Sequence, residues 1–598
     1  MKYGSDIMAE LIAKLGIEYI SFNPGATFRG LHDSLVNHPS EKMPETITCT
    51  HEEISVAIAH GYAKASGKAM AVGIHNVVGL QHASMAVFNA WCDRVPILLL
   101  GGGGPMAVEK RRPWIDWIHS ALVQGNLIRD FVKYDDQPAS IHSVPESIYR
   151  AYRIAVNEPA GPAYVCLDAA IQEEPLPEKN LDVGGLLQID QLPDPRLYTA
   201  GTSPGPDLDA LKVLANAVWE AEWPVIVAER TGQSTEAFFA LSKIAQEWSI
   251  PVIGKESRLN IPTHHPMNMN DASYEIMERA DVVIAVDVGD IYRNIAKTDR
   301  VNRTTKSVLR PEARIFSVGL EDYGVRSWAS DYHQMYPTEL NIRTNSEVLI
   351  KGLGKALNEM KNGSGESAKE FNLVKANIDL RRNEAESIQK KLRLKWQNKI
   401  DKEREEEKIT VSVLASEMWK VIKDYDFVLA NGNLRGWTHR IFNMDQPRQF
   451  LGHSGGAGLG YGIGATIGAC LAHRGSDKLI VDIQSDGDLL FTPGGLWTLA
   501  HHKLPALIVM NNNRTYFNSE KHQATTAEYR GRDVSRAGIG TKIEEPAVNF
   551  AELAHSMGVH GIGPIEHVEE IVPALQEAVD RIRREKKAVL VDIITKSE

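Results

Sequence analysis

Cysteine is scarce in this chain, and the patterns required by disulfide scaffolds, metal ribbons and membrane spans are missing. Only four of the 598 residues are cysteines, and no two of them form a CxxC pair. This argues against a zinc ribbon and against a disulfide framework. No apolar run is long enough to cross a bilayer, and no secretory signal opens the chain. We therefore expect a cytoplasmic, reduced protein with no membrane partner.

An excess of positive charge is also absent. The chain has 66 Lys and Arg residues against 77 Asp and Glu residues, so its net charge is −11. A mildly acidic chain has no general attraction to nucleic acid, and we expect no nucleic-acid partner. The apolar fraction of 43% and the charged fraction of 24% are those of an ordinary globular protein. The length suggests three or four domain-sized units.

Strand-like and helical patterns alternate along the chain. Short apolar runs typical of buried parallel strands are separated by helical apolar spacing. The clearest runs are residues 17–22, 70–74, 97–100, 163–167, 224–228, 281–286, 314–318, 427–430, 478–483, 506–510 and 588–594. This alternation predicts an α/β fold of three doubly wound, mostly parallel-sheet domains. Gly101 to Gly104 lack the Lys-Ser/Thr of a phosphate loop, so a flexible strand-end loop is predicted there.

Two breaks in composition divide the chain. Residues 173–206 are rich in proline, glycine and polar residues, as interdomain linkers are. A second break at residues 362–365 precedes a charged, helix-prone stretch, for which we predict a solvated helical connector. The predicted parts are a first domain at 1–175, a central domain at 205–360, the connector at 361–408 and a last domain at 409–598.

Polar side chains follow two neighbouring predicted strands near the C-terminus. The run at 478–483 leads into Ser485-Asp486-Gly487-Asp488, and the run at 506–510 leads into Asn511-Asn512-Asn513-Arg514-Thr515. Open α/β sheets bind ligands at this carboxyl edge. A carboxylate, a carboxamide oxygen and a backbone carbonyl suit Mg²⁺ or Ca²⁺ holding a diphosphate.

The spacing of these residues resembles the thiamine diphosphate motif. An Asp-Gly pair is followed by Asn-Asn, with 513 − 486 = 27 positions between the two side chains that the motif uses. The resemblance implies that Asp486 and Asn513 bind Mg²⁺ and that Thr515 offers its backbone carbonyl. It also places Gly487, Asp488 and Asn513 at the cofactor. The usual motif opens Gly-Asp-Gly, whereas Ser485 opens it here.

A glutamate in the first domain fits the same family. Glu52 precedes Gly61-Tyr62-Ala63, and 61 − 52 = 9 positions is the family spacing. The resemblance implies that Glu52 hydrogen-bonds N1′ of the cofactor's pyrimidine and favours the tautomer that acts as the base. Glu53, one position along, points elsewhere on a helix.

A glycine run at 452–464 provides the third signal. It resembles the segment that supports the thiazolium ring, with Gly458 at the cofactor and Leu459 as the apolar wedge that bends it. A loose GxGxxA at Gly460, Gly462 and Ala465 leaves a nicotinamide oxidoreductase open as an alternative, although no strand leads tightly into it.

Nearly the whole chain therefore resembles the thiamine diphosphate-dependent decarboxylase and carboligase superfamily, which includes acetolactate synthase, benzoylformate decarboxylase and pyruvate decarboxylase. The resemblance implies a pyrimidine-binding, a central and a diphosphate-binding domain, with thiamine diphosphate and Mg²⁺ as cofactors. It also implies a site shared between two subunits, hence a homodimer at least and commonly a homotetramer. The central domain has no dense glycine pattern after His265-Pro266, so we expect no FAD.

Three histidines are candidates for the acid–base work on the substrate. His75 follows the predicted strand at 70–74 and matches a catalytic histidine of benzoylformate decarboxylases. His265 also aligns with a histidine of those enzymes, and His453 adjoins the glycine run. Ala26 stands where benzoylformate decarboxylases use a serine.

The predicted activity is the cleavage or formation of the C–C bond next to a carbonyl. Decarboxylation of a 2-oxo acid and acetolactate synthase-like carboligation are the leading forms. A 2-hydroxyacyl (CoA) lyase of the same superfamily, an NAD-binding oxidoreductase and a non-catalytic cofactor-binding protein are the alternatives. The expected ligand is a small 2-oxo acid, aldehyde or hydroxyacyl compound, and the sequence leaves its side chain open.

Overall fold

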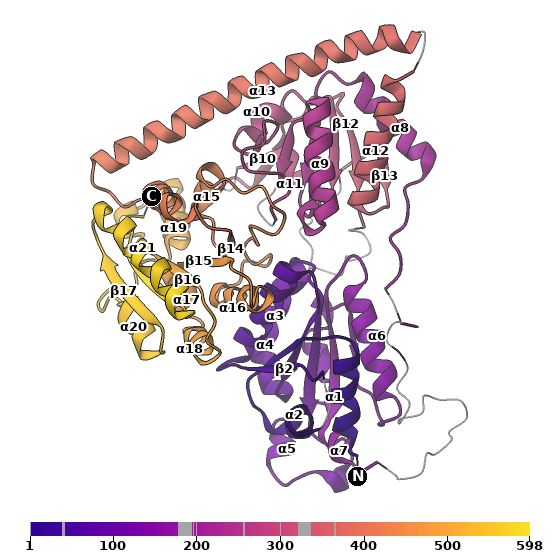
Figure 1. Cartoon of the computed structure of the whole chain (residues 1–598), viewed down its shortest axis with the longest axis vertical. Helices are drawn as coiled ribbons and strands as arrows, with labels where there is room; N and C mark the ends of the chain where they lie inside the picture. The colour runs from indigo at the N-terminus through magenta and orange to yellow at the C-terminus, as the bar shows by residue number, and fades with distance from the viewer. Residues whose placement is uncertain are drawn as a thin grey trace.

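The structure is a computed structural model that describes residues 2–38, 42–176, 194, 197–198, 200–254, 258–299, 301–320, 336–363 and 366–597. Three α/β modules follow one another along the chain, and a long helix spans two of them (Figure 1). We call them the N-terminal module (residues 2–176), the central module (205–360) and the C-terminal module (409–597). Within the described residues, no helix combines the length and hydropathy that a bilayer crossing needs.

The N-terminal module has a six-stranded parallel sheet of order β2-β1-β3-β4-β6-β5. Its strands are β1 (Tyr19–Phe22), β2 (Glu45–Thr48), β3 (Met70–Ile74), β4 (Ile97–Gly103), β5 (Tyr134–Asp136) and β6 (Pro162–Asp168). Its α-helices are α1 (Gly4–Lys14), α2 (Arg29–Asn37), α3 (Glu52–Ser66), α4 (Asn76–Cys92), α5 (Ile115–Ile118), α6 (Val144–Val156) and α7 (Ala169–Glu173). The central strands are buried along their whole length, as strands covered by helices on both faces are.

The central module has a five-stranded parallel sheet of order β13-β12-β9-β7-β8 and a separate antiparallel pair, β10 and β11. The strands are β7 (Pro224–Ala228), β8 (Val252–Gly254), β9 (Val282–Val286), β10 (Ala296–Asp299), β11 (Thr304–Ser307), β12 (Arg314–Val318) and β13 (Leu340–Ile342). The helices are α8 (Leu208–Glu220), α9 (Thr235–Trp248), α10 (Ser273–Met277), α11 (Ile291–Ile295) and α12 (Ser346–Lys361).

The C-terminal module repeats the pattern with a five-stranded parallel sheet of order β14-β15-β16-β18-β17. The strands are β14 (Phe427–Asn431), β15 (Leu479–Ser485), β16 (Leu507–Asn512), β17 (His560–Ile565) and β18 (Val589–Ile594). The helices are α14 (Val411–Ile422), α15 (Trp437–Ile441), α16 (Gly462–Ala472), α17 (Asp486–Leu489), α18 (Gly494–His501), α19 (Phe517–Tyr529), α20 (Phe550–Ser556) and α21 (Val568–Glu585). The predicted fold class of three mostly parallel α/β units is confirmed.

The N-terminal and C-terminal modules share one hydrophobic core. Apolar side chains of α3 and β3 belong to the same buried cluster as those of α16 and β15. Helices α3 and α16 cross closely because small residues line the contact: a Cβ on Gly464 would lie 2.5 Å from Cβ of Ala57, and one on Gly468 would lie 2.2 Å from the Ile58 carbonyl oxygen. Gly464 and Gly468 thus serve the packing of these two helices. The N–H groups of Gly460 and Gly462, which belong to the loose GxGxxA, donate instead to Asp488. The nicotinamide alternative stays a prediction.

The connector is one long helix, α13 (Glu366–Glu405), which runs along the edge of the central and C-terminal modules (Figure 1). The sequence predicts a solvated helix, but one face is buried. Ile378 and Ile388 belong to the central core, and Ile400 belongs to a core of the C-terminal module. Arg381 is buried and donates to the carbonyls of Glu222, Trp248 and Ser249. The helix therefore braces two modules.

Gly101 to Gly103 are part of a strand and not of a flexible loop, and Gly104 follows the end of that strand. Strand β4 continues through Gly103, with Gly101 opposite Cys166 in β6. Side chains are excluded here by close neighbours: a Cβ on Gly101 would lie 2.0 Å from Oη of Tyr164, and one on Gly102 would lie 2.3 Å from Oγ1 of Thr27. The prediction of a loop is wrong because these glycines provide close packing rather than a turn.

Candidate functional site

Two strand ends of the C-terminal module lie side by side, as their sequence predicts. Strands β15 and β16 are parallel neighbours, and Ser485 is opposite Asn511 at their carboxyl ends. Asp486 begins the short helix α17 directly after β15, and Asn513 follows directly after β16. The register of one sheet therefore carries two oxygen-bearing side chains to the same edge.

The oxygens of these side chains converge on one backbone amide. The N–H of Thr515 donates to Oδ2 of Asp486 at 3.2 Å and to Oδ1 of Asn513 at 3.1 Å. Oδ1 of Asp486 accepts from the N–H of Gly487 at 2.8 Å. The hydroxyl of Thr515 is turned the other way, to Glu520 and the Thr541 carbonyl. We call Asp486, Asn513 and Thr515 the C-terminal edge cluster.

This cluster has the chemistry of a hard-cation site. Asp486 is 2% exposed, and burial raises the pKa of its carboxyl to about 6 although backbone N–H donors oppose the rise. A buried carboxylate of this kind gains most from a cation, and a carboxamide oxygen beside it is a preferred Mg²⁺ or Ca²⁺ ligand. Asp486 and Asn513 therefore fit a divalent ion. The N–H of Thr515 donates to both side chains and so holds their oxygens next to each other.

Asp488 holds the glycine run instead of facing the edge cluster. Its Oδ1 accepts from the N–H of Gly460 at 2.8 Å, and its Oδ2 accepts from the N–H of Gly462 at 3.2 Å and from Nε2 of Gln484 at 2.5 Å. Gly487, next to it, has the Tyr516 ring where a Cβ would lie, at 2.5 Å. Direct contact of Asp488 and Gly487 with a cofactor stays a prediction, whereas the clamp on the glycine run is visible.

The glycine run is also fastened to the N-terminal module. Asn89 of α4 donates through Nδ2 to the Gly458 carbonyl at 3.3 Å and accepts from the Gly458 N–H at 3.1 Å. Both backbone groups of Gly458 are thereby engaged within the chain. The side chain of Leu459 stays 38% exposed beside them. An apolar side chain held in the open on a fixed backbone is suited to pressing against a ligand.

Glu52 is the first residue of α3 and is 6% exposed. Its Oε1 accepts from Nδ2 of Asn23 at 3.3 Å. A Cβ on Gly79 would lie 2.9 Å from this oxygen and 3.3 Å from Cβ of His75, so the carboxylate and the histidine are neighbours across that glycine. Glu53 points the other way, because a Cβ on Gly460 would lie 2.7 Å from its Oε1. The predicted divergence of the two glutamates is seen.

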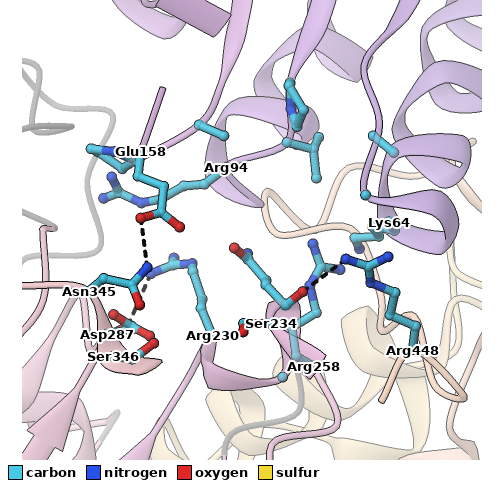
Figure 2. A pocket seen from close by; sticks show the side chains of 18 of the residues that line it. Lys64, Arg94, Glu158, Arg230, Ser234, Arg258, Asp287, Asn345, Ser346 and Arg448 are labelled. Atoms are coloured by element: carbon cyan, nitrogen blue, oxygen red, sulfur yellow. Dashed lines mark hydrogen bonds between the residues drawn. The ribbon is translucent and has the colours of Figure 1, made fainter. Parts of the chain in front are cut away.

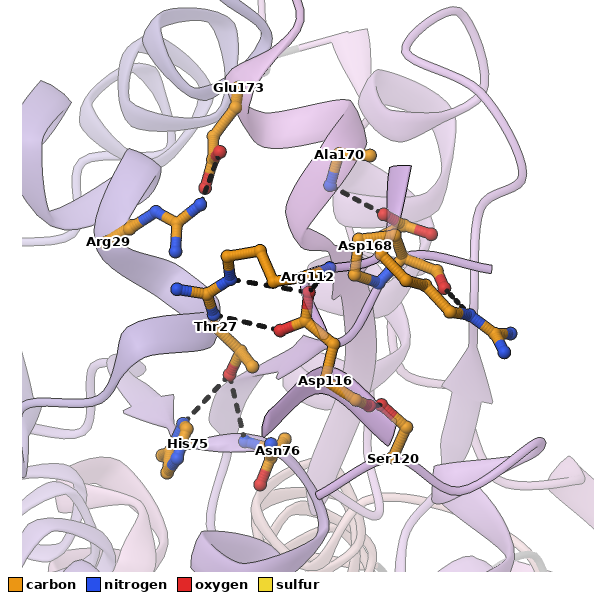
Figure 3. A network of polar contacts seen from close by, with 12 residues as sticks. Thr27, Arg29, His75, Asn76, Arg112, Asp116, Ser120, Asp168, Ala170 and Glu173 are labelled. Atoms are coloured by element: carbon orange, nitrogen blue, oxygen red, sulfur yellow. Dashed lines mark hydrogen bonds and ion pairs between the residues drawn. The ribbon is translucent and has the colours of Figure 1, made fainter. Parts of the chain in front are cut away.

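His75 sits in a fitted niche at the end of β3. A Cβ on Gly25 would lie 2.4 Å from Cβ of His75, so two glycines, Gly25 and Gly79, leave room for the ring. The hydroxyl of Thr27 lies 3.0 Å from Nδ1 of His75 and accepts from the N–H of Asn76 at 3.3 Å (Figure 3). Ala26 lacks a hydroxyl, and Thr27 beside it supplies one to the histidine. Burial and the nearby His119 lower the pKa of His75, and Glu52 opposes this.

His119 is a site residue that the sequence analysis missed. Its ring lies edge-on to His75 with 5.6 Å between the centroids, and its Nδ1 is buried with no hydrogen-bond partner among the described residues. The segment that carries it is held by an Arg112–Asp116 ion pair at 2.9 Å (Figure 3). The Met106 N–H also donates to Oδ2 of Asp168 at 2.7 Å. No feature of the sequence indicates this role, because His119 lies 44 positions from His75 and belongs to no recognisable motif. We call Glu52, His75, Thr27 and His119 the N-terminal edge cluster.

The other two predicted histidines lie elsewhere. His265 is in the central module, where one ring nitrogen lies 3.1 Å from the Ser242 carbonyl oxygen and the other accepts from the Met267 N–H at 3.1 Å. Both of its nitrogens are thus used by local backbone, which speaks for a structural histidine. His453 lies at the start of the glycine run, and its carbonyl accepts from Nζ of Lys64 at 2.6 Å.

A cationic cavity of about 250 Å³ lies where the three modules meet (Figure 2). Arg230, Arg258, Arg448 and Lys64 face it. Arg448 donates to the carbonyls of Ser66 and Gln233, at 2.9 Å and 3.1 Å, and Arg258 donates to that of Leu451 at 3.1 Å. These arginines tie the modules together through backbone oxygens. Neither edge cluster contributes to the lining of this cavity.

Comparison with known proteins identifies both ends of the chain. Residues 2–124 match the N-terminal TPP binding domain of the thiamine pyrophosphate enzymes, and residues 430–593 match their C-terminal TPP binding domain. The first range contains Glu52 and His75, and the second contains the C-terminal edge cluster.

Curated relatives and solved structures cover the whole chain. A "Probable acetolactate synthase large subunit" of Methanocaldococcus jannaschii is 24% identical over 96% of this chain and 90% of its own length. The acetolactate synthase large subunit of Haemophilus influenzae is 23% identical over 99% and 94%. A thiamine diphosphate-dependent 4-hydroxybenzoylformate decarboxylase of Rhodococcus jostii RHA1 superposes with a TM-score of 0.75 at 18% identity, over 100% of both chains.

Proposed function

Because the chain belongs to the thiamine diphosphate-dependent enzyme superfamily, we propose that it is a Mg²⁺-dependent decarboxylase of a small 2-oxo acid. The observation that carries this proposal is the position of His75 beside Glu52, with Thr27 on one ring nitrogen. A histidine next to the activating carboxylate supplies what a decarboxylase needs after CO₂ leaves, which is a proton donor.

The C-terminal edge cluster would hold Mg²⁺ and, through it, the diphosphate. Asp486 and Asn513 offer the oxygens, and the Thr515 N–H fixes both side chains before a ligand arrives. Thr515 would add its backbone carbonyl. Ligands that are already ordered need no reorganisation on binding, which favours affinity. The cofactor held there would supply the electron sink that decarboxylation of a 2-oxo acid needs.

Glu52 would hold the proton at N1′ of the cofactor's aminopyrimidine. Its burial and its bond from Asn23 keep the carboxylate in one orientation. Leu459 would press against the cofactor and enforce its bent shape. A carboxyl group that exchanges a proton with a ring nitrogen in a dry cleft is an effective general acid and base.

The two histidines would divide the work on the substrate. His75 would donate the proton that replaces CO₂ through Nε2, because its Nδ1 is occupied by the Thr27 hydroxyl. His119 has a buried nitrogen without a partner among the described residues, and this nitrogen would bind the substrate carboxylate or carbonyl oxygen. Ile118 and Leu122, close to His119 in the sequence, are exposed apolar side chains that would help to exclude water from a bound substrate.

Acetolactate synthase-like carboligation is the second candidate. Its support is that the curated relatives are acetolactate synthases and that Ala26 lacks the serine hydroxyl of benzoylformate decarboxylases. A 2-hydroxyacyl (CoA) lyase remains an alternative, because it cleaves a C–C bond by the same cofactor chemistry.

A panel of 2-oxo acids, each with and without an aldehyde acceptor, separates these activities. Release of CO₂ with an aldehyde as product supports the decarboxylase. Acetolactate or an acyloin as the main product would contradict it.

We further propose a cytoplasmic homodimer, or a homotetramer built from two such dimers, in which each site uses Glu52 of one copy and Asp486 of the other. The exposed apolar side chains of Trp114 and Leu122 on one module and of Phe491 and Ile539 on the other support a contact between copies. No FAD is expected.

Subunit mixing tests this arrangement. Chains with Glu52→Gln are co-expressed with chains carrying Asp486→Ala, and mixed dimers are isolated through two tags. One of the two sites of a mixed dimer then has both residues intact, so activity should return to about half the wild-type value per dimer. Mixed dimers that remain as inactive as the parents would show that each site forms within one chain.

A further inference from the structure

A pair of histidines lies beside Glu52 and is not used by the proposed chemistry. His51 precedes α3, and His82 lies on α4 one turn beyond Gly79. Nε2 of His51 is 2.7 Å from Nδ1 of His82, and the two rings meet edge to face with 4.7 Å between their centroids. A nitrogen of each ring and an oxygen of Glu52 all lie within 4.8 Å of one another.

The helix start decides which ring nitrogen carries each proton. Nδ1 of His51 accepts from the backbone N–H of Glu53 at 3.2 Å, so it has a lone pair and no proton. A neutral imidazole then carries its proton on Nε2. That proton points at Nδ1 of His82, which must accept it, and the proton of His82 is left on its Nε2. One backbone N–H thereby sets the tautomer of both rings.

A neutral His51 ring suits this position. Burial lowers the pKa of His51, and the second histidine lowers it further, while the Glu52 carboxylate opposes both effects. A protonated His51 would have no acceptor for the Glu53 N–H and would place a positive charge at a helix N-terminus, where it is unfavourable. The arrangement therefore depends on His51 staying neutral with its ring held at one angle.

The same tautomer argues against a metal ion at these three residues. A metal needs the lone pair of Nε2 on His51, and that nitrogen carries a proton as long as Nδ1 caps the helix. Metal binding at His51, Glu52 and His82 would have to break the cap first. The geometry therefore favours a hydrogen-bonded relay over a metal centre.

We propose that His82 is a positioning residue for Glu52. It accepts from His51 and fixes that ring, His51 caps the first turn of α3, and this turn carries Glu52. Gly79, on the same face of α4, lies directly under the Glu52 carboxylate, so α4 holds the start of α3 at two points. This inference rests on the proposed function for its catalytic consequence, because Glu52 acts there as the activating carboxylate.

A double-mutant cycle tests the relay. His82→Phe keeps a flat ring but removes the acceptor nitrogen. His51→Ser replaces the ring with a hydroxyl that caps a helix without a partner. The readouts are the rate of hydrogen–deuterium exchange at C2 of bound thiamine diphosphate, the cofactor dissociation constant and the thermal midpoint. His142→Phe, at a half-buried histidine of the same module, is the matched control.

The relay predicts that the effects are not additive. His82→Phe alone should slow C2 exchange about tenfold and leave cofactor affinity within about threefold. In the His51→Ser background, His82→Phe should change the exchange rate by less than about twofold, because the cap no longer needs it. His142→Phe should change neither quantity. An equal loss in both backgrounds would overturn the relay, since His82 would then act without His51.

Two further outcomes are decisive. If Zn²⁺ alone binds the cofactor-free protein at one site per chain and His82→Phe abolishes that binding, the cluster is a metal site and the relay is wrong. If the wild-type protein shows no C2 exchange, the proposed function fails while the relay stays testable. The double-mutant cycle is then measured by the thermal unfolding midpoint. His82→Phe should lower this midpoint in the wild-type background and leave it unchanged in the His51→Ser background.

Discussion

The two edge clusters are built differently, and the difference assigns them different tasks. The C-terminal edge cluster comes from two adjacent strand ends within 30 residues, and backbone N–H groups order its side chains. The N-terminal edge cluster is assembled from four separate segments, and its side chains are held by packing around glycines and by one another. A rigid, backbone-ordered cluster suits anchoring, whereas a cluster of titratable side chains suits proton transfer. Variants of the first should change affinity, and variants of the second should change rate.

The largest effect is expected at the anchor. Asp486→Ala removes the buried carboxylate of the C-terminal edge cluster and should weaken Mg²⁺-dependent binding of thiamine diphosphate at least about 100-fold, or about 2.7 kcal/mol. Titration calorimetry with and without Mg²⁺ measures this. Asp580→Ala, on the exposed face of α21, is the control and should bind normally. Unchanged affinity in Asp486→Ala would mean that the metal is held elsewhere.

His75→Phe should separate rate from affinity. We expect turnover of the best 2-oxo acid to fall about 100-fold because the proton donor is lost, with cofactor affinity within about threefold. Burial and His119 lower the pKa of His75, so less of it is protonated at neutral pH. Wild-type turnover should therefore rise as pH falls from about 8 to about 6, and this response should vanish in the variant. A matching pH profile in both proteins would assign the proton to another group.

His119→Phe tests whether the residue absent from the sequence prediction belongs to the chemistry. The ring contact with His75 is kept and the unpartnered nitrogen is lost. We expect KM for the substrate to rise about tenfold with a smaller change in kcat, because a single hydrogen bond to a charged group is lost. Steady-state kinetics measure both. An unchanged KM would leave His119 as packing for His75.

Asp488→Asn should have the smallest effect. The amide keeps an acceptor for Gly460 but presents a donor toward Gly462 and Gln484. The loosened glycine run should cost about fivefold in cofactor affinity, or about 1 kcal/mol, with turnover at saturating cofactor nearly unchanged. Calorimetry on the same preparations as Asp486→Ala provides the comparison. A loss as large as that of Asp486→Ala would make Asp488 a direct ligand.

The two clusters also differ in how far the sequence predicts them. Asp486 and Asn513 follow apolar runs that parallel-sheet rules place side by side, so their meeting can be inferred from the amino-acid sequence alone. The pattern also places Glu52 at a helix start and His75 at a strand end, as the structure has them. The roles assigned to Gly458, Leu459 and Asp488 needed the resemblance to known enzymes, and the structure adds that Asn89 and Asp488 hold the backbone of the glycine run.

What escaped prediction depends on contacts between distant segments. The ring of His119 lies beside that of His75, and its segment is held by an ion pair and by a backbone N–H on Asp168. Gly101 to Gly103 pair with β6, and Tyr164, Thr27 and Cys166 occupy the space where their side chains would lie. Composition alone cannot reveal these neighbours. The buried face of α13 was hidden by its high charge, since Arg381 is buried through three carbonyl partners supplied by the central module.

The central claim is that a carboxylate of the N-terminal module activates a cofactor anchored by the C-terminal module. Hydrogen–deuterium exchange at C2 of bound thiamine diphosphate, compared between wild type and Glu52→Gln, tests it most directly. The account predicts exchange at least about 100-fold slower in the variant, with cofactor affinity within about threefold. Equal exchange rates with the cofactor fully bound would contradict it.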